Sequence, residues 1–212
     1  MKLALFYDTE TTGLPLFDQP SEDPRQPHIV QLGAALVDLD TRMVLSSLDV
    51  IVKPDGWEIP AEVAAIHGIT TELALEVGVP EGEAVGMLLA MWDQAACRIG
   101  HNEQFDARIV RIALMRHFPT AEGEAVVADQ WKAGKAECTQ RICTPIMKLP
   151  PTAKMKAAGR FHHKSANLSE AYLHFTGKPL DGAHSAMVDV RACLEVYFAA
   201  TAPAQATEPT EA

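Results

Sequence analysis

The chain of 212 residues lacks long apolar runs and contains few cysteines and few aromatic residues. No stretch approaches the roughly twenty apolar residues that a membrane-spanning helix needs, and the first residues lack the pattern of a signal peptide. We therefore expect a cytoplasmic protein that does not cross a membrane. The length suits one domain with a sizeable core, and the hydrophobic content of 48% is typical of such a domain.

The four cysteines form no C-x-x-C pair and are too few for a disulfide framework. Free thiols are the expected state. A zinc site is the alternative, built from Cys138, Cys143, His162 and His163. Because this spacing matches no standard zinc finger, free thiols are favoured.

Positive charge is scarce overall, since the formal net charge is −10, which argues against a general polyanion binder. Its distribution is uneven. Residues 131–164 hold eight lysines and arginines against one acid, for a net charge of +7, whereas the rest holds ten basic and 27 acidic residues, for −17. We interpret residues 131–164 as a basic, proline-containing insertion that suits a phosphate backbone. A solvated loop with a chance excess of lysine is the alternative.

Two carboxylates, Asp8 and Glu10, follow an apolar run at residues 3–7 that predicts a buried strand. Side chains alternate along a strand, so Asp8 and Glu10 share one face while Thr9 points away. Like charges so close repel unless a cation offsets them, and a hard ion such as Mg²⁺ or Mn²⁺ prefers these oxygen ligands. Two solvated acids at a surface strand end are the alternative.

The remaining pattern predicts an α/β fold, a mixed sheet flanked by helices. Strands are expected at residues 28–38 and 44–52, paired as an antiparallel hairpin, and at residues 98–101. Helices are expected at residues 60–67, 81–96, 105–118, 165–175 and 185–199. The small, polar residues 200–212 predict a disordered tail, which leaves one domain over residues 1–199.

The segment GHNEQFD places Asp106 in the first turns of a predicted helix, from where its carboxylate could reach Asp8 across the sheet. Acids also favour helix starts for electrostatic reasons alone. Asn102 is expected to cap or brace this turn, and Phe105 to lie in the core.

The segment GAHSAMVDVRA places His184 just before the last predicted helix and Asp189 slightly more than one helical turn later. An imidazole that titrates near neutrality can accept a proton from water, and the acid can hold a metal. A histidine at a helix start can also serve as a cap or a surface residue.

Together, four segments resemble the DEDD exonuclease superfamily, specifically its DnaQ-like histidine subtype (DEDDh), which includes polymerase proofreading subunits and RNase T. They are DTETTG from Asp8, IHGIT from Ile66, HNEQFD from His101 and HSAMVD from His184, and they occur in this order within residues 3–198. The resemblance implies a ribonuclease H-like fold. It also implies a 3′–5′ exonuclease that releases nucleoside 5′-monophosphates.

The resemblance assigns roles to individual residues. The implied metal ligands are Asp8, Glu10, Asp106 and Asp189. The implied general base is His184, acting with Glu10 and two divalent ions, Mg²⁺ or Mn²⁺, that clamp the scissile phosphate. The candidate substrate-binding residues are Thr9, Thr11, Thr12, Leu14, His67, Asn102 and Phe105. For His67, a purely structural role at a helix end before Gly68 is nearly as well supported.

The expected substrate is single-stranded or frayed DNA, and RNA is the rival because the motifs show no contact to a 2′-hydroxyl. A polymerase or another replication or repair protein is a candidate partner. A nucleic-acid-binding module without turnover and a phosphodiesterase acting on small nucleotides remain open. Residues 131–164 depart from compact relatives, and we hypothesise that they form a substrate-guiding arm.

Overall fold

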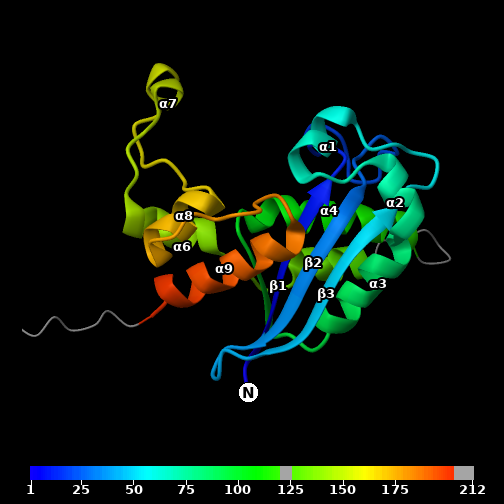
Figure 1. Ribbon diagram of the computed structural model, residues 1–212, viewed down its shortest axis with the longest axis horizontal. Coiled ribbons are helices and arrows are strands. Elements are labelled where there is room, and N and C mark those ends of the chain that lie inside the picture. Colours follow the sequence, from blue (N-terminus) through cyan, green and yellow to red (C-terminus); the bar gives the residue numbers. More distant parts are fainter. Residues whose placement is uncertain (120–125, 203–212) are drawn as a thin grey trace, which may run out of the picture.

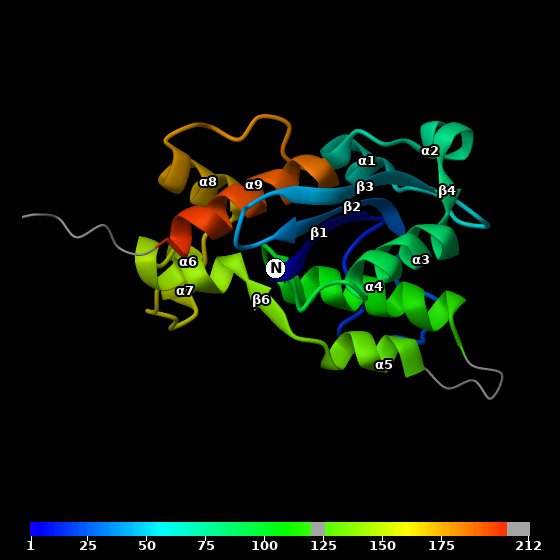
Figure 2. The ribbon, with the colours of Figure 1, turned by 90° about the horizontal axis from the view of Figure 1, so that it is seen from below.

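The computed structural model describes residues 1–119 and 126–202 (Figure 1). Its centre is a six-stranded sheet in the order β4-β3-β2-β1-β5-β6, with helices on both faces (Figure 2). The α/β class predicted from the sequence is confirmed. No described helix is long and apolar enough to cross a membrane.

The three long strands form an antiparallel meander, and the shorter strands extend it on both sides. The strands are β1 (Leu3–Thr11), β2 (Ile29–Asp38), β3 (Val44–Lys53), β4 (Val79–Pro80), β5 (Cys97–Gly100) and β6 (Ala136–Cys138). The predicted hairpin between β2 and β3 is confirmed. Because β5 pairs parallel to β1 and β6 parallel to β5, the carboxyl ends of these three strands lie at one end of the sheet.

The two faces of β1 enter different cores, as strand alternation requires. Leu5 and Tyr7 pack with Trp131 against helices α3 (Glu81–Trp92), α4 (Glu103–His117) and α5 (Val126–Ala133). Ala4 and Phe6 pack on the other face against α9 (Ala186–Ala200). The remaining helices are α1 (Ala61–His67), α2 (Thr71–Val77), α6 (Thr139–Met147), α7 (Ala153–Ala157) and α8 (Leu168–Thr176).

The basic segment, residues 131–164, is more structured than the predicted insertion. Trp131 is fully buried, β6 forms an edge strand, and Cys143 of α6 belongs to a core shared with α8 and α9. Helices α5, α6 and α7 were not predicted, because each is short and α6 contains Pro145, a residue that is unusual inside a helix. Only residues 149–164, which include α7, stand away from the body (Figure 1).

Other boundaries shift by a few residues. Helix α3 ends at Trp92 rather than residue 96, and α8 begins at Leu168 because Asn167 forms a capping box with Glu170. Helix α9 continues to Ala200, one residue into the predicted tail, of which residues 203–212 lie outside the described part. The four cysteines are free thiols, as expected. Cys143 is buried, whereas His162 and His163 are exposed on the protruding segment.

Candidate active site

The carboxylates of Asp8 and Glu10 continue the row of β1 side chains that faces α9. Ala4 and Phe6 of this row lie in the core beneath α9, and Thr9 points to the opposite face. The alternation predicted from the sequence therefore holds through the end of the strand. It brings two acids to the carboxyl end of β1, where the apolar core gives way to solvent.

Asp189 meets these acids from the first turn of α9. Its Oδ2 accepts a hydrogen bond from the backbone N–H of His184 at 3.1 Å, and His184 itself adopts a left-handed backbone with φ of 68°. Ligand atoms of Glu10, His184 and Asp189 all lie within 4.8 Å of one another. The exposed imidazole of His184 therefore stands at the rim, over two carboxylates.

Gly33 permits this close approach of α9 to the sheet. It lies opposite Asp8 in the β1–β2 register, and a Cβ atom there would come within 2.6 Å of the carbonyl carbon of Ala186. The side chain of Gln31 adds a tether, because its Oε1 accepts a hydrogen bond from the Ala186 N–H at 3.1 Å. The sequence analysis missed both residues. The available signal was a glycine inside an apolar strand, which often marks a close backbone contact.

Asp106 enters from the other face, on the first turn of α4. Its Oδ1 accepts two hydrogen bonds from Thr9, from the hydroxyl at 2.7 Å and from the backbone N–H at 3.0 Å. Asn102 takes the position before α4 with a left-handed φ of 64°, and its side chain makes no capping hydrogen bond. Asn102 is the N-cap residue, as expected, but it does not cap the helix through its side chain. The backbone carbonyl of Asn102 accepts from Phe105 N–H instead.

Burial raises the pKa values of all four carboxyl groups, and the charges of neighbouring site acids add to the rise at Asp8 and Glu10. Burial, followed by the charges of Asp106, Asp189 and Glu10, raises the pKa of Asp8 well above its usual range. Burial, followed by the charges of Asp189 and Asp106, raises the pKa of Glu10 to about 7. Burial also raises the pKa of Asp106 to about 7, although its hydrogen bonds with Thr9 oppose the shift. Such a cluster is costly unless a cation compensates the charges.

The donor set fits hard divalent cations. Four carboxylates, Asp8, Glu10, Asp106 and Asp189, offer the oxygen ligands that Mg²⁺ and Mn²⁺ prefer. The Oδ1 atom of Asp189 is buried without a hydrogen-bond partner, so it has unused coordination capacity. The arrangement can hold metal beside the imidazole of His184, and metal ions next to a proton acceptor suit phosphodiester hydrolysis.

The predicted substrate-binding residues divide into two groups. Thr9 is 5% exposed with its hydroxyl bonded to Asp106, and Phe105 packs against the core, so both support the site from within. Leu14 is 73% exposed just beyond β1. His67 is the last residue of α1. Burial lowers the pKa of His67, and the charge of the nearby His184 lowers it further.

Thr11, the last residue of β1, and Thr12, which follows it, shape the chain at the site entrance. Thr11 donates its hydroxyl to the Gly13 carbonyl at 2.8 Å. The Thr12 hydroxyl accepts from the His28 N–H at 3.0 Å, and the Thr12 N–H donates to the His28 carbonyl at 3.0 Å. The exposed Leu14 remains available to a ligand.

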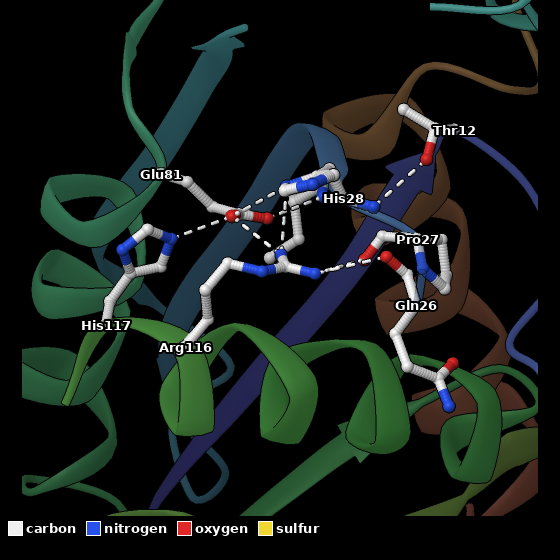
Figure 3. Close-up of polar contacts among 8 residues, drawn as sticks. Thr12, Gln26, Pro27, His28, Glu81, Arg116 and His117 are labelled. Atoms are coloured by element: carbon white, nitrogen blue, oxygen red, sulfur yellow. Dashed lines mark hydrogen bonds and ion pairs between the residues drawn. The ribbon is translucent and has the colours of Figure 1, made fainter. Parts of the chain in front are cut away.

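A second buried charge cluster, which the sequence analysis missed, lies where the residue before β2 meets α3 and α4 (Figure 3). Glu81 Oε2 lies 2.8 Å from His117 Nε2, 2.9 Å from Arg116 Nη1 and 3.1 Å from His28 Nδ1. Burial would raise the Glu81 pKa, but hydrogen bonds with both histidines and the charge of Arg116 hold it well below its usual range. Because His28 also bonds Thr12, the cluster braces the chain at the site entrance.

Comparisons with known proteins identify the family and the fold of the chain. The RNase_T family model, described as exonuclease, matches residues 5–197. E. coli exonuclease I in complex with a dT13 oligonucleotide is a structural neighbour with a TM-score of 0.70 and 19% identity, covering 93% of this chain and 40% of that chain. Product-bound exonuclease I gives a TM-score of 0.69 and 18% identity over 94% of this chain and 43% of that one.

The chain therefore spans about two fifths of the length of these exonuclease I chains. The likeness confirms the ribonuclease H-like fold that the sequence resemblance implied. No curated protein matches the chain.

Proposed function

The chain belongs to the RNase_T family of exonucleases, in the DEDD superfamily, and on that premise we propose that it is a metal-dependent 3′–5′ exonuclease of single-stranded DNA. The observation that carries the proposal is the convergence of Glu10, His184 and Asp189, with Asp8 and Asp106 close enough to perturb their charges. The expected products are nucleoside 5′-monophosphates. The presence of His184 at the rim supports the histidine subtype.

In this proposal, each residue of the site has a distinct task. Asp8, Glu10, Asp106 and Asp189 would hold two divalent ions, Mg²⁺ or Mn²⁺. When bound, the ions supply a nucleophilic water and stabilise the charge on the leaving 3′ oxygen. His184, exposed above Glu10 and Asp189, accepts the proton of the attacking water.

Other residues position these groups or the substrate. The His184 N–H bond to Asp189 fixes the loop that carries the imidazole. The Thr9 bonds hold Asp106 in place. The terminal nucleotide would lie on the turn at Thr11 and Thr12, together with Leu14 and His67, and Asn102 is exposed directly before α4, the helix that carries Asp106.

The oligonucleotide in the exonuclease I neighbours favours single-stranded DNA as the substrate. An exoribonuclease and a non-catalytic nucleic-acid-binding module are the alternatives. A replication or repair protein, including a polymerase, is a candidate partner. The chain covers 40% of that exonuclease I chain, so the activity of the whole relative is carried over here only as a proposal.

The test uses purified protein with 5′-labelled single-stranded DNA and RNA of one sequence, in Mg²⁺, Mn²⁺ or EDTA. Shortening from the 3′ end, dependent on metal and abolished in Asp8→Ala, is the expected result. A phosphorothioate linkage at the 3′ end should block the ladder, whereas the same linkage at the 5′ end should not. Faster loss of RNA than of DNA would assign an exoribonuclease. Intact oligomers of both kinds in every metal would contradict the proposal.

A further inference from the structure

Residues 149–164, here called the arm, form an ordered protrusion between α6 and α8. The N–H of Lys164 donates to the Leu149 carbonyl at 3.0 Å and closes the base of the arm. At its tip, the Thr152 hydroxyl caps α7, and the Arg160 N–H donates to the Met155 carbonyl at 2.9 Å. Figure 1 shows α7 standing out from the body at the same end as the arrowhead of β1, the strand end that carries the carboxylates.

The base of the arm is tied to the strand end that leads to Asp106. The carbonyl of the buried Ala166, two residues after the arm, lies 3.0 Å from His101 Nε2 and accepts from Gln140 Nε2 at 3.0 Å. The other ring nitrogen of His101 lies 2.9 Å from the Thr139 hydroxyl. His101 follows β5 directly and precedes α4, so the arm is fixed relative to the carboxylate site.

The arm carries the kinds of side chain that bind single-stranded nucleic acids in general. It contains no acidic residue, and in the part of the chain that the structure describes its exposed Lys154, Lys156 and Arg160 form no ion pair. Lys164, at its base, pairs with Glu170. Phe161 is 73% exposed beside Arg160 and has no structural role in the described core. Cations that track phosphates and an exposed aromatic ring for stacking are the chemistry of single-strand recognition.

The distribution of charge favours the approach of a polyanion along the arm rather than over the rest of the surface. Outside residues 131–164 the chain carries a net charge of −17, and the carboxylate site adds local negative charge before metal binds. A phosphate backbone that leads into the site is therefore repelled by most of the surface. The protruding arm offers compensating positive charge at the same end of the sheet.

We propose that the arm binds a single-stranded nucleic acid on the 5′ side of the cleaved nucleotide. Lys154, Lys156 and Arg160 contact phosphates, and Phe161 stacks on a base. The inference rests on the proposed 3′–5′ direction, because a 3′ end seated at the carboxylates leaves only the 5′ portion to reach the arm. The arm is then a length sensor, since short substrates end before they reach it.

The experiment measures binding and cleavage separately. Binding of 5′-fluorescein-labelled dT20 is followed by anisotropy in EDTA over a series of salt concentrations, and kcat/KM is measured for dT20 and for a dinucleotide. The variants are the triple Lys154→Ala, Lys156→Ala, Arg160→Ala and the single Phe161→Ala. The matched control removes three exposed cations near the opposite end of the sheet, Lys2→Ala, Arg42→Ala and Lys135→Ala.

The arm triple should weaken dT20 binding by about tenfold and make the slope of log K against log salt shallower by about 2, since each phosphate contact on a single strand contributes about 0.7. Phe161→Ala should weaken binding by about fivefold with little change in slope, as expected for lost stacking. Cleavage of the dinucleotide should stay within about twofold of wild type in both variants, because the substrate is too short to meet the arm.

Binding of dT20 by the arm triple at wild-type strength would overturn the inference, as would an equal loss in the control triple or an equal loss of dinucleotide cleavage. A wild-type protein that cleaves neither substrate would contradict the proposed function instead. The arm-dependent binding measured in EDTA would still stand in that case, so the two failures are distinguishable.

Discussion

Thr9 donates both its hydroxyl and its backbone N–H to a single oxygen atom, Oδ1 of Asp106, at 2.7 and 3.0 Å. The two residues lie 97 positions apart, Thr9 on β1 and Asp106 on α4. The contact fixes one carboxylate oxygen of Asp106. Thr9, whose side chain faces away from Asp8 and Glu10, therefore helps to build the carboxylate cluster.

Replacement of the Thr9 hydroxyl by a methyl group, in Thr9→Val, should weaken metal binding. The hydrogen bond opposes the rise in the Asp106 pKa that burial causes, so its loss raises that pKa further and lets protons compete with metal. A charge-assisted hydrogen bond contributes about 1.5–3 kcal/mol, so the metal concentration for half-maximal activity at pH 7 should rise about tenfold or more. Metal titrations of activity at pH 7 and pH 9 measure this.

Thr9→Ser is the matched control, because it keeps the hydroxyl and should retain most of the metal affinity. The Thr9→Val defect should shrink at pH 9, where Asp106 is ionised without help. A defect of equal size at both pH values would mean that geometry, rather than proton competition, explains the loss.

The metal-free protein should lose stability as the pH rises from about 4 to about 7. Folding raises the pKa of Glu10 from 4.5 to about 7 and that of Asp106 from 3.8 to about 7, so the native state binds these protons more tightly than the unfolded state. Stability is therefore greatest while both groups are protonated and declines as they ionise. Thermal unfolding in EDTA across this range measures the effect, and added Mg²⁺ or Mn²⁺ should restore the melting temperature above pH 7.

Asp106→Asn should flatten this pH dependence and raise the melting temperature in EDTA at pH 8 by about 5 °C, since it removes one ionised group from the cluster. Asp55→Asn is the control, because Asp55 is an exposed acid away from β1. A similar flattening in Asp55→Asn would assign the slope to general surface charge.

Gly33→Ala should disable the site while leaving a folded protein. The added methyl group would lie 2.6 Å from the Ala186 carbonyl carbon, so the start of α9 must move away from the sheet and carry Asp189 and His184 with it. Cleavage should fall by about a hundredfold, because misplacement of about 1 Å at reacting groups costs that much. Steady-state kcat/KM, with far-ultraviolet circular dichroism to verify the fold, measures the outcome.

Gly86→Ala in α3 provides the comparison. A Cβ atom there meets its nearest neighbour, Phe118 Cζ, at 3.6 Å, which is ordinary van der Waals contact. The change should keep full activity and stabilise the helix slightly, by up to about 1 kcal/mol. If Gly33→Ala were as active as Gly86→Ala, the close packing of α9 on β2 would not position the site.

Glu81→Gln should destabilise the fold by about 3 kcal/mol at pH 7, because it leaves Arg116 without its charged partner in a buried cluster. The Glu81 pKa is held low by folding, so its contribution is complete above about pH 4.5 and is lost as the pH falls. The free energy of unfolding measured in urea should therefore differ strongly between Glu81→Gln and wild type at pH 7, and less at pH 3. Glu83→Gln, at an exposed position in the same helix, should change stability little at either pH. A Glu81→Gln penalty that did not depend on pH would contradict the ionic account.

The sequence predicted those parts of the fold that depend on local periodicity. The apolar run before Asp8 identified β1, its alternation placed Asp8 and Glu10 on one face, and the apolar stripe at residues 105–118 identified most of α4. The spacing of His184 and Asp189 likewise predicted a loop residue followed by a helical acid. The exceptions include the short helices α2, α5, α6 and α7, in which few apolar positions can repeat.

The sequence by itself determined the main elements and which candidate site residues they bear, because alternation and helical period are properties of neighbouring residues. Only the tertiary structure decided how those elements meet. The bonds of Thr9 to Asp106, the contact of Gly33 with Ala186 and the cluster around Glu81 each join distant segments. No local pattern encodes such partners, since a buried polar group or a missing side chain acquires its partner only when the chain packs.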